Sequence, residues 1–471
     1  MLRPATDSLL NALRTALPEA AFRAPDPRYF EEPRGRWQGR AAAVLAPGSP
    51  DEASTIMRLA NDARVPVVPF SGGTGLVGGQ IAPDGPAPLL ISTERLKSIR
   101  ATHAQENVLI AEAGATLAEI QSAANNAGRL FPLSYASEGT ARIGGALAVN
   151  SGGLAVLRYG TARDLCLGLE AVLPNGAVWN GLTRLRKDNT GYSLRDLLIG
   201  AEGTLGLITA AALRLFPAPT ARATALLTVT SPETALALFA RAGAMLGETV
   251  SAFELISGMG FGFLAETGLG PARPFDPAPP WMVLIEAAAS HGAPEAALEA
   301  LFTAALEAGE VVDGVLAHSE AQRADLWALR ETIPAANARI GAIASHDIAL
   351  PLSEIPGFLE ETGASLARLA PALRINAFGH LGDGNLHYNI FPPAGAPREA
   401  HLALRDDATR LIHDAVDARG GSFSAEHGVG RLKVGELERY GDPTKLAAMR
   451  AIKAALDPNG IMNPGAVLRG D

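Results

Sequence analysis

The glycine-rich passage at residues 71–79 restricts the fold more than any other part of this sequence. Gly73, Gly75 and Gly78 satisfy the dinucleotide-binding pattern G-x-G-x-x-G. In a Rossmann fold a helix follows that pattern at once, because the helix N-terminus receives the pyrophosphate. Residues 81–88 read Ile-Ala-Pro-Asp-Gly-Pro-Ala-Pro, a composition that cannot form this helix. The passage therefore argues against a nicotinamide-dependent Rossmann dehydrogenase.

Two further passages, residues 137–153 and 200–209, are also dense in glycine and other small residues. A backbone of this kind can approach a ligand closely and turn several N–H groups toward a phosphate. The alternative is a set of flexible surface loops. Three such passages between residues 71 and 209 predict a large cofactor held mostly by main chain.

Composition limits the protein class. A chain of 471 residues is too long for one core, so we expect two or three domains. Apolar residues make up 48% and charged residues 19%, which is typical of a globular protein, and the net charge of −9 argues against nucleic acid as a partner. The only cysteine, Cys166, excludes an internal disulfide and is expected to be buried.

The N-terminal residues favour an amphipathic helix over a signal peptide, and no run of 18 apolar residues predicts a membrane span. Capping signals predict helices after Ser49, Thr116 and Ser231. Residues 216–219, Phe-Pro-Ala-Pro, are typical of a domain boundary. Beyond them strands and helices mix without glycine-rich loops, which predicts an α+β substrate domain.

Residues 378–389 carry the strongest candidate site. Asp383-Gly384 predicts a two-residue hairpin turn, in which His380 lies opposite His387. Opposed side chains on one face of a hairpin have Cβ atoms about 5 Å apart, so two imidazoles there can bind one cation. Strand alternation places Asn389 on the same face as His387. About forty residues further on, Glu426 offers a carboxylate ligand and His427 offers a third imidazole. Ordinary hydrogen-bonded histidines beside a turn are the alternative.

Taken together in this order, the motifs from about Arg40 to Leu468 resemble the vanillyl-alcohol oxidase/p-cresol methylhydroxylase superfamily of FAD enzymes. Within it they resemble the D-2-hydroxyacid branch, which includes D-lactate dehydrogenases, D-2-hydroxyglutarate dehydrogenases and the glycolate oxidase flavin subunit. The resemblance implies an α+β chain. It has a two-subdomain FAD-binding domain of the p-cresol methylhydroxylase type (residues 1–217), a substrate or cap domain on an antiparallel sheet (218–418), and a segment returning to the FAD domain (419–471).

The resemblance also implies roles for individual residues. His380, His387 and Glu426 match the family's divalent-metal ligands, for Zn²⁺, Mn²⁺ or Fe²⁺. His427 matches the catalytic base, Asn389 a contact to the substrate carboxylate, and Arg330 an arginine that faces the substrate. The FAD-binding positions are Ser71, Gly72, Gly73, Thr74, Gly75, Leu76, Gly78 and Gly79 at the pyrophosphate; Ser137, Gly139, Ile143, Gly144, Gly145, Asn150, Gly152 and Gly153 along the flavin; Glu202, Gly203, Gly206 and Ile208 on the adenosine side; and Asn463 at the flavin.

Two positions depart from the dicarboxylate-specific members of the branch. Pro334 stands where those enzymes typically have threonine, and Ser345 where they have lysine. Both groups would hold a distal carboxylate. The primary expectation is therefore metal-assisted, FAD-dependent oxidation of a D-lactate-like 2-hydroxy acid to the 2-oxo acid. D-2-hydroxyglutarate is the alternative substrate.

More distant alternatives are a metal-dependent hydrolase without redox cofactor and a non-catalytic subunit of a larger flavin complex. The expected partners are a small 2-hydroxy acid and an electron acceptor, which is a quinone, a cytochrome, an electron-transferring flavoprotein or oxygen. The expected location is the cytoplasm, with peripheral membrane attachment, a homodimeric state and covalent FAD attachment left open.

Overall fold

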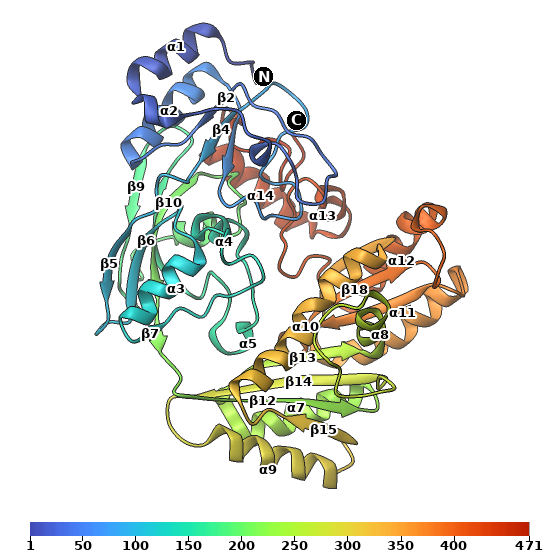
Figure 1. Ribbon diagram of the computed structural model, residues 1–471. Helices are drawn as coiled ribbons and strands as arrows, with labels where there is room; N and C mark the ends of the chain where they lie inside the picture. The colour runs from blue at the N-terminus through green and yellow to red at the C-terminus, as the bar shows by residue number, and fades with distance from the viewer. Residues whose placement is uncertain (471) are drawn as a thin grey trace. The chain divides into compact units, whose positions relative to one another are not determined.

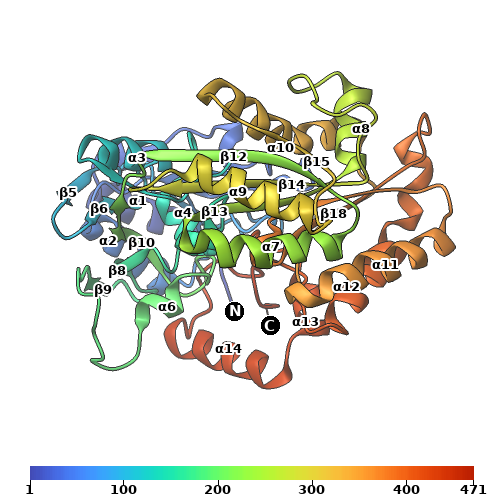
Figure 2. The same cartoon turned by 90° about the horizontal axis from the view of Figure 1, so that it is seen from below.

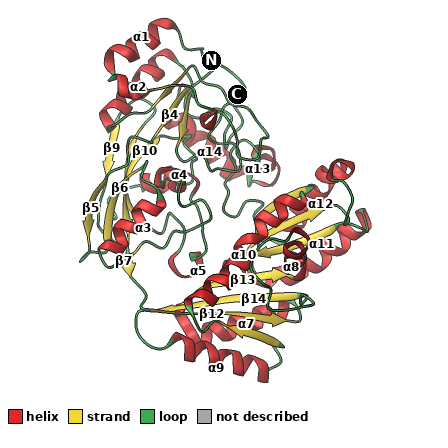
Figure 3. Cartoon of the chain, viewed as in Figure 1, coloured by secondary structure: helices red, strands yellow, loops and turns green. Residues whose placement is uncertain are grey.

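The computed structural model describes residues 1–470 of the chain, and these divide into two compact units. The first unit comprises residues 1–153, 160–218 and 426–470, and the second comprises residues 154–159 and 219–425. The long second unit is therefore inserted into the first. Figure 3 shows that both units mix helices with sheets.

The first unit contains a four-stranded sheet near the N-terminus, in the order β1-β2-β4-β3. Its strands are β1 (Phe22–Arg23), β2 (Ala43–Leu45), β4 (Leu89–Ser92) and β3 (Val67–Phe70). Strands β2 and β3 pair with β4 in parallel, and helices α1 (Asp7–Ala16) and α2 (Pro50–Ala63) bury their apolar faces in the same core. Residues 461–463 extend this sheet, because the N–H groups of Val67 and Asn463 bond to the carbonyls of Ile461 and Val67.

A five-stranded antiparallel sheet forms the other half of the first unit, in the order β5-β6-β10-β8-β9. Its strands are β5 (Ile99–His103), β6 (Val108–Glu112), β10 (Leu207–Arg214), β8 (Cys166–Val172) and β9 (Val178–Gly181). The short pair β7 (Arg129–Leu130) and β11 (Phe216–Pro217) lies apart from it. The helices of this part and of the C-terminal return are α3 (Leu117–Asn126), α4 (Ile143–Val149), α6 (Leu194–Leu198), α13 (Val434–Tyr440) and α14 (Pro443–Leu456).

The second unit is built on one seven-stranded antiparallel sheet, in the order β15-β12-β14-β13-β17-β18-β16 (Figure 1). Its strands are β15 (Asp313–Leu316), β12 (Ala221–Val229), β14 (Trp281–Ala289), β13 (Val250–Ser257), β17 (Arg374–Gly379), β18 (Asn385–Phe391) and β16 (Ala344–Ala349). Alternate side chains of the central strands enter two different apolar cores, because successive residues of a strand point to opposite faces.

Helices cover both faces of this sheet. On one face lie α7 (Pro232–Leu246), α9 (Pro294–Glu307), α11 (Ile355–Leu369) and α12 (Arg405–Asp417). Figure 2 shows α7 and α9 side by side along the strands. On the other face lie α8 (Gly258–Thr267) and α10 (Glu320–Ile340), and the short helix α5 (Val156–Tyr159) also belongs to this unit. The site described below is on the α8 and α10 face.

Local sequence signals account for most helix starts. Thr116 and Glu119 form the predicted capping box of α3. The Ser49 and Ser231 hydroxyls accept from the backbone N–H of the third residue of α2 and of α7. Helix α10 continues ten residues past Arg330. Pro334 lies inside it and lacks an N–H, but buried Ile333, Ala336 and Asn337 hold the second half against the sheet.

Among residues 1–470, no helix combines the length and apolar character that spanning a membrane requires. The single thiol, Cys166, is buried in β8 as expected, and burial raises its pKa to about 12. A thiol with so high a pKa is a poor nucleophile, which argues against covalent flavin attachment at this residue.

Candidate active site

The turn between β17 and β18 differs from the predicted two-residue hairpin. Residues Leu381–Asp383 form one turn of 3₁₀ helix, and only Gly384 has a positive φ, of +84°. The strands pair with Phe378 opposite His387, so His380 lies beyond the paired region and the predicted register is wrong. The cause is a longer turn, in which buried Leu381 enters the core and the Asp383 carboxylate accepts the N–H of Asn385.

The predicted faces of β18 are nevertheless correct. Leu386, Tyr388 and Ile390 are buried in the core on the α7 and α9 side. His387 and Asn389 therefore point to the opposite face, toward α8 and α10. The ring centroids of His380 and His387 are 5.9 Å apart, so the longer turn still brings the two imidazoles together.

His380, His387 and Glu426 form a group that could hold a metal ion. One ligand atom from each residue lies within 4.8 Å of the others. Glu426 directly follows Ala425, the last residue of the second unit, and the Ala425 N–H donates to the Asp347 carbonyl at 3.2 Å. Two imidazoles and a carboxylate suit Zn²⁺, Mn²⁺ or Fe²⁺, so the donor chemistry fits the predicted metal.

Sequence reasoning missed Glu254, a fully buried carboxylate in β13. Its Oε1 is 2.6 Å from His380 Nδ1, and its Oε2 accepts from Arg330 Nε at 2.8 Å. Burial raises the pKa of Glu254, but the charges and hydrogen bonds of His380 and Arg330 outweigh burial and lower it to about 2. The available signal was a charged residue within the otherwise buried strand Val250–Ser257, since a buried charge needs a partner.

Arg330 and Asn389 offer unused hydrogen-bond donors on this face. Arg330 lies over the ring of Phe378, with Cζ 4.8 Å from the centroid. Apart from the Nε bond to Glu254, its guanidinium donates to no residue of the range 1–470. The Asn389 side chain is only 7% exposed and has no hydrogen bond to any described residue. Both groups are therefore free to bind carboxylate oxygens of a ligand.

His427 lies in the C-terminal segment of the first unit, which begins at Glu426. Its Nε2 is 3.6 Å from Glu426 Oε1. Buried Glu202 holds the following residues, because its two carboxylate oxygens accept the N–H groups of Val429 (2.7 Å) and Gly430 (2.8 Å). Burial raises the pKa of Glu202 to about 7, although these two N–H groups act in the opposite direction. Predicted as an adenosine contact, Glu202 thus anchors the Glu426–Gly430 loop with its side chain.

The passage at residues 71–79 has the form of an anion-binding loop. From Gly72 to Gly79, no backbone N–H donates a hydrogen bond to a residue described by the structure. Gly73 and Gly78 have positive φ values of +73° and +72°, a conformation that recurs in backbone loops that bind anions through their N–H groups. A phosphate-bearing cofactor fits this loop, because it would satisfy donors that the protein leaves unpaired.

Several predicted cofactor residues are glycines at which two backbone segments pack closely together. A Cβ on Gly72 would lie 2.5 Å from the Thr140 carbonyl, and one on Gly144 would lie 2.7 Å from Ala113. Ile143, Gly144 and Gly145 open helix α4, and Asn150 ends it with a φ of +55°. The other predicted positions keep to their segments: Ser137 and Gly139 in the turn before α4, Gly152 and Gly153 after it, Gly203 and Gly206 before β10, and Ile208 in β10.

Asn463 joins three of these segments. Its side-chain amide donates to the carbonyls of Gly79 (2.8 Å) and Glu202 (2.9 Å) and accepts from Arg431 at 3.1 Å. Arg431, which was not predicted, has a buried Nη1 that finds no partner among the described residues. An unpaired cationic donor beside the glycine-rich loop also fits an anionic cofactor.

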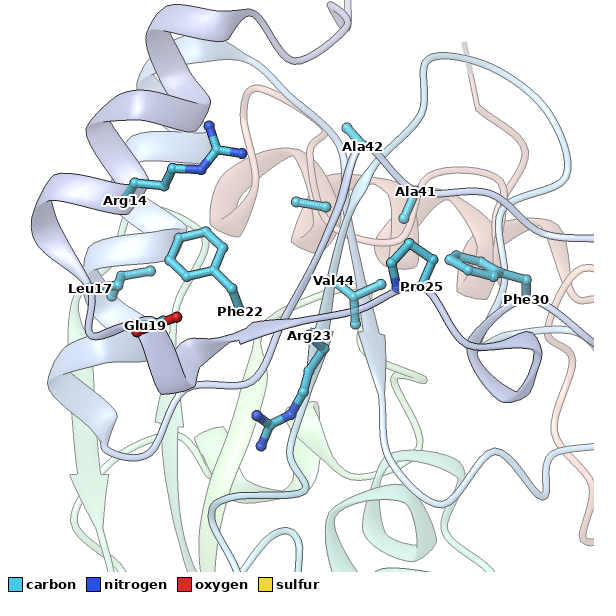
Figure 4. A pocket seen from close by; sticks show the side chains of 11 residues that line it. Arg14, Leu17, Glu19, Phe22, Arg23, Pro25, Phe30, Ala41, Ala42 and Val44 are labelled. Atoms are coloured by element: carbon cyan, nitrogen blue, oxygen red, sulfur yellow. The ribbon is translucent and has the colours of Figure 1, made fainter.

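A surface pocket of about 520 Å³ lies elsewhere in the first unit. It is lined by residues of α1, β1 and β2 and of the segments that connect them, including Arg14, Phe22 and Phe30, as Figure 4 shows. None of the predicted metal, catalytic or cofactor residues lines it. The candidate active site is therefore distinct from this pocket.

Comparison with known proteins supports an FAD cofactor. Residues 41–181 match the family described as FAD binding domain, and residues 218–467 match FAD linked oxidases, C-terminal domain. D-2-hydroxyglutarate dehydrogenase of Xanthomonas citri pv. viticola is 36% identical over 463 residues, covering 98% of this chain and 97% of the relative. The chain belongs to the FAD-dependent D-2-hydroxyacid dehydrogenases. The mitochondrial D-2-hydroxyglutarate dehydrogenase of Bos taurus is 37% identical, over 93% of this chain and 80% of its own length.

Solved structures place this FAD-dependent dehydrogenase in the predicted fold class. p-Cresol methylhydroxylase with substrate bound superposes with a TM-score of 0.76 at 16% sequence identity, covering 100% of this chain and 99% of the other. 4-Ethylphenol oxidase from Gulosibacter chungangensis superposes with a TM-score of 0.71 at 17% identity, over 98% and 97% of the two chains. The protein is thus an FAD-linked hydroxyacid dehydrogenase of the p-cresol methylhydroxylase fold.

Proposed function

We propose that this dehydrogenase oxidises D-2-hydroxyglutarate to 2-oxoglutarate with the assistance of a divalent metal ion. The proposal rests on two unused donor groups, Arg330 of α10 and Asn389 of β18, which lie on the same face of the sheet as the metal-ligand candidate His387. A substrate with two carboxylates suits two separate donor sites. The relatives from Xanthomonas and Bos taurus both bear this substrate in their names, which favours it over the D-lactate-like substrate expected from sequence.

In this proposal His380, His387 and Glu426 hold the metal, which would act as a Lewis acid on the substrate hydroxyl and C1 carboxylate. His427 takes the hydroxyl proton, because an imidazole can accept a proton near neutral pH. Asn389 binds the C1 carboxylate and Arg330 binds toward the distal end of the substrate. FAD supplies the acceptor for the hydride that leaves C2. Two electrons and two protons thus leave the 2-hydroxy acid.

The substrate assignment is tested by anaerobic flavin reduction. The purified chain is mixed with D-2-hydroxyglutarate, L-2-hydroxyglutarate, D-lactate and D-malate, and the loss of oxidised-flavin absorbance is followed. Rapid bleaching by D-2-hydroxyglutarate and slow or absent bleaching by its L-enantiomer is expected. Bleaching by D-lactate alone would contradict the assignment.

A second candidate is a D-2-hydroxy acid without a distal carboxylate, such as D-lactate. It is favoured by Pro334 and Ser345, which are exposed and carry no charge. Ser345 lies directly opposite Asn389 in the sheet, and Pro334 follows Arg330 by one helical turn. The same substrate panel decides between the candidates. Turnover with quinone, cytochrome, electron-transferring flavoprotein or oxygen then identifies the physiological class of acceptor.

A further inference from the structure

Glu254 contacts both His380, a proposed metal ligand, and Arg330, a proposed substrate-binding residue. Its Oε1 is 2.6 Å from Nδ1 of His380, a proposed metal ligand. Its Oε2 accepts from Nε of Arg330, the proposed substrate-binding arginine, at 2.8 Å. The side chains of Glu254 and Arg330 are only 1% and 5% exposed, so no water competes effectively for these bonds.

We propose that Glu254 is a positioning residue that couples metal binding to substrate binding; the inference rests on the proposed function of this face. An ionised carboxylate can only accept hydrogen bonds, so the His380 proton must be on Nδ1. In the neutral imidazole that metal binding requires, the lone pair of His380 is then on Nε2, the nitrogen left for the metal. The second oxygen holds Arg330 by Nε, which leaves both terminal nitrogens of the guanidinium for a substrate carboxylate.

The two tasks depend on one side chain, in which each carboxylate oxygen contacts one of the two partners. A rotation that improves the bond to His380 lengthens the bond to Arg330, because both oxygens belong to one rigid carboxylate. Substrate held by Arg330 therefore restrains the orientation of His380, and bound metal restrains Arg330. Coupling of this kind is reciprocal in binding free energy.

Glu286 provides a matched control in the neighbouring strand β14. It is also buried, at 5% exposure, and its carboxylate accepts from Trp327 Nε1 at 2.8 Å and from Arg323 at 3.1 Å, both on α10. None of its partners is a proposed metal, substrate or cofactor residue. A general loss of packing or charge in this sheet would therefore affect Glu254→Gln and Glu286→Gln alike.

The experiment compares wild type, Glu254→Gln and Glu286→Gln as FAD-loaded full chains stripped with a chelator. Mn²⁺ binding is measured by calorimetry, and KM and kcat for D-2-hydroxyglutarate are measured at saturating Mn²⁺. Glutamine keeps one acceptor oxygen and replaces the other by an N–H₂ donor, so it cannot accept from His380 and Arg330 with separate oxygens as Glu254 does. We expect Mn²⁺ affinity to fall about 10- to 100-fold in Glu254→Gln, the usual effect of losing such an outer partner.

Two further results are expected at saturating Mn²⁺. KM should rise about tenfold or more in Glu254→Gln, as for a lost hydrogen bond that orients a charged group, while kcat falls less. Glu286→Gln should match wild type in Mn²⁺ affinity and KM. Wild-type values in Glu254→Gln, or equal losses in Glu286→Gln, would overturn the inference.

A second pair of variants covers the case in which Glu254→Gln does not fold. Arg330→Met is compared with the double variant Glu254→Leu/Arg330→Met, in which neither buried charge is left alone. Mn²⁺ affinity should again be about 10- to 100-fold weaker when the acceptor for His380 is removed. Equal affinities would overturn the inference. Absence of Mn²⁺ binding by wild type would instead refute the proposed function itself.

Discussion

Substitution of Gly72 by alanine should disturb the packing of the 71–79 loop against residues 140–142. The free-energy cost can be estimated from the structure. The new Cβ would lie 2.5 Å from the Thr140 carbonyl and 3.0 Å from Ala141 Cα, and ordinary contact begins at 3.4 Å. The obstacle is backbone and not a flexible side chain, so the 71–79 loop must move away from residues 140–142 by several tenths of an ångström. Overpacking of this kind costs about 1–3 kcal/mol.

This free-energy cost should appear either as weaker FAD binding or as a lower free energy of unfolding. If the loop relaxes in the apoprotein, the cost is met when FAD binds, and FAD affinity falls about 5- to 150-fold for 1–3 kcal/mol. If the loop cannot relax, the free energy of unfolding falls by about 1–3 kcal/mol instead. Flavin fluorescence titration of the apoprotein measures the first quantity, and urea unfolding measures the second.

Gly435→Ala is the matched control in the same unit. Gly435 is exposed in helix α13, and a Cβ there would meet nothing within 4 Å. Alanine should stabilise this helix by about 0.5–1 kcal/mol and leave FAD affinity unchanged. If Gly72→Ala keeps both wild-type FAD affinity and wild-type stability, the close approach of these two segments does not shape the cofactor site.

Three other predictions concern proton transfer, metal and pH. His427→Ala should retain FAD but slow flavin reduction by substrate by roughly 10² or more, as for a lost general base; unchanged stopped-flow kinetics would remove His427 from that role. Chelation should abolish turnover without releasing FAD, and added Mn²⁺ or Zn²⁺ should restore it in wild type but not in His387→Ala; full activity of metal-free protein would refute the metal assignment. The pKa of Glu202, raised by burial from 4.5 to about 7, predicts stability that is present below pH 4.5 and lost as pH rises to about 7, by roughly 3 kcal/mol. Urea unfolding across this range should show the loss in wild type and not in Glu202→Gln, and parallel curves would contradict it.

The sequence alone determined features that depend on neighbouring residues. Ser49, Thr116 and Ser231 cap helices because each hydroxyl needs only an N–H three residues away. His387 and Asn389 share a face because strand alternation is a property of one strand. The absence of a helix after Gly79 was equally local, since prolines and glycine follow at once.

Only the tertiary structure decided which distant groups meet. Glu254 and His380 are 126 residues apart in sequence, and their contact exists because β13 pairs with β17. The 3₁₀ turn at Leu381–Asp383 replaced the expected hairpin because burial of Leu381 in the core outweighed the local turn preference. Glu202 likewise became the anchor of Val429 and Gly430 only through folding. Buried charges take partners from wherever the fold provides them, and chain order does not specify those partners.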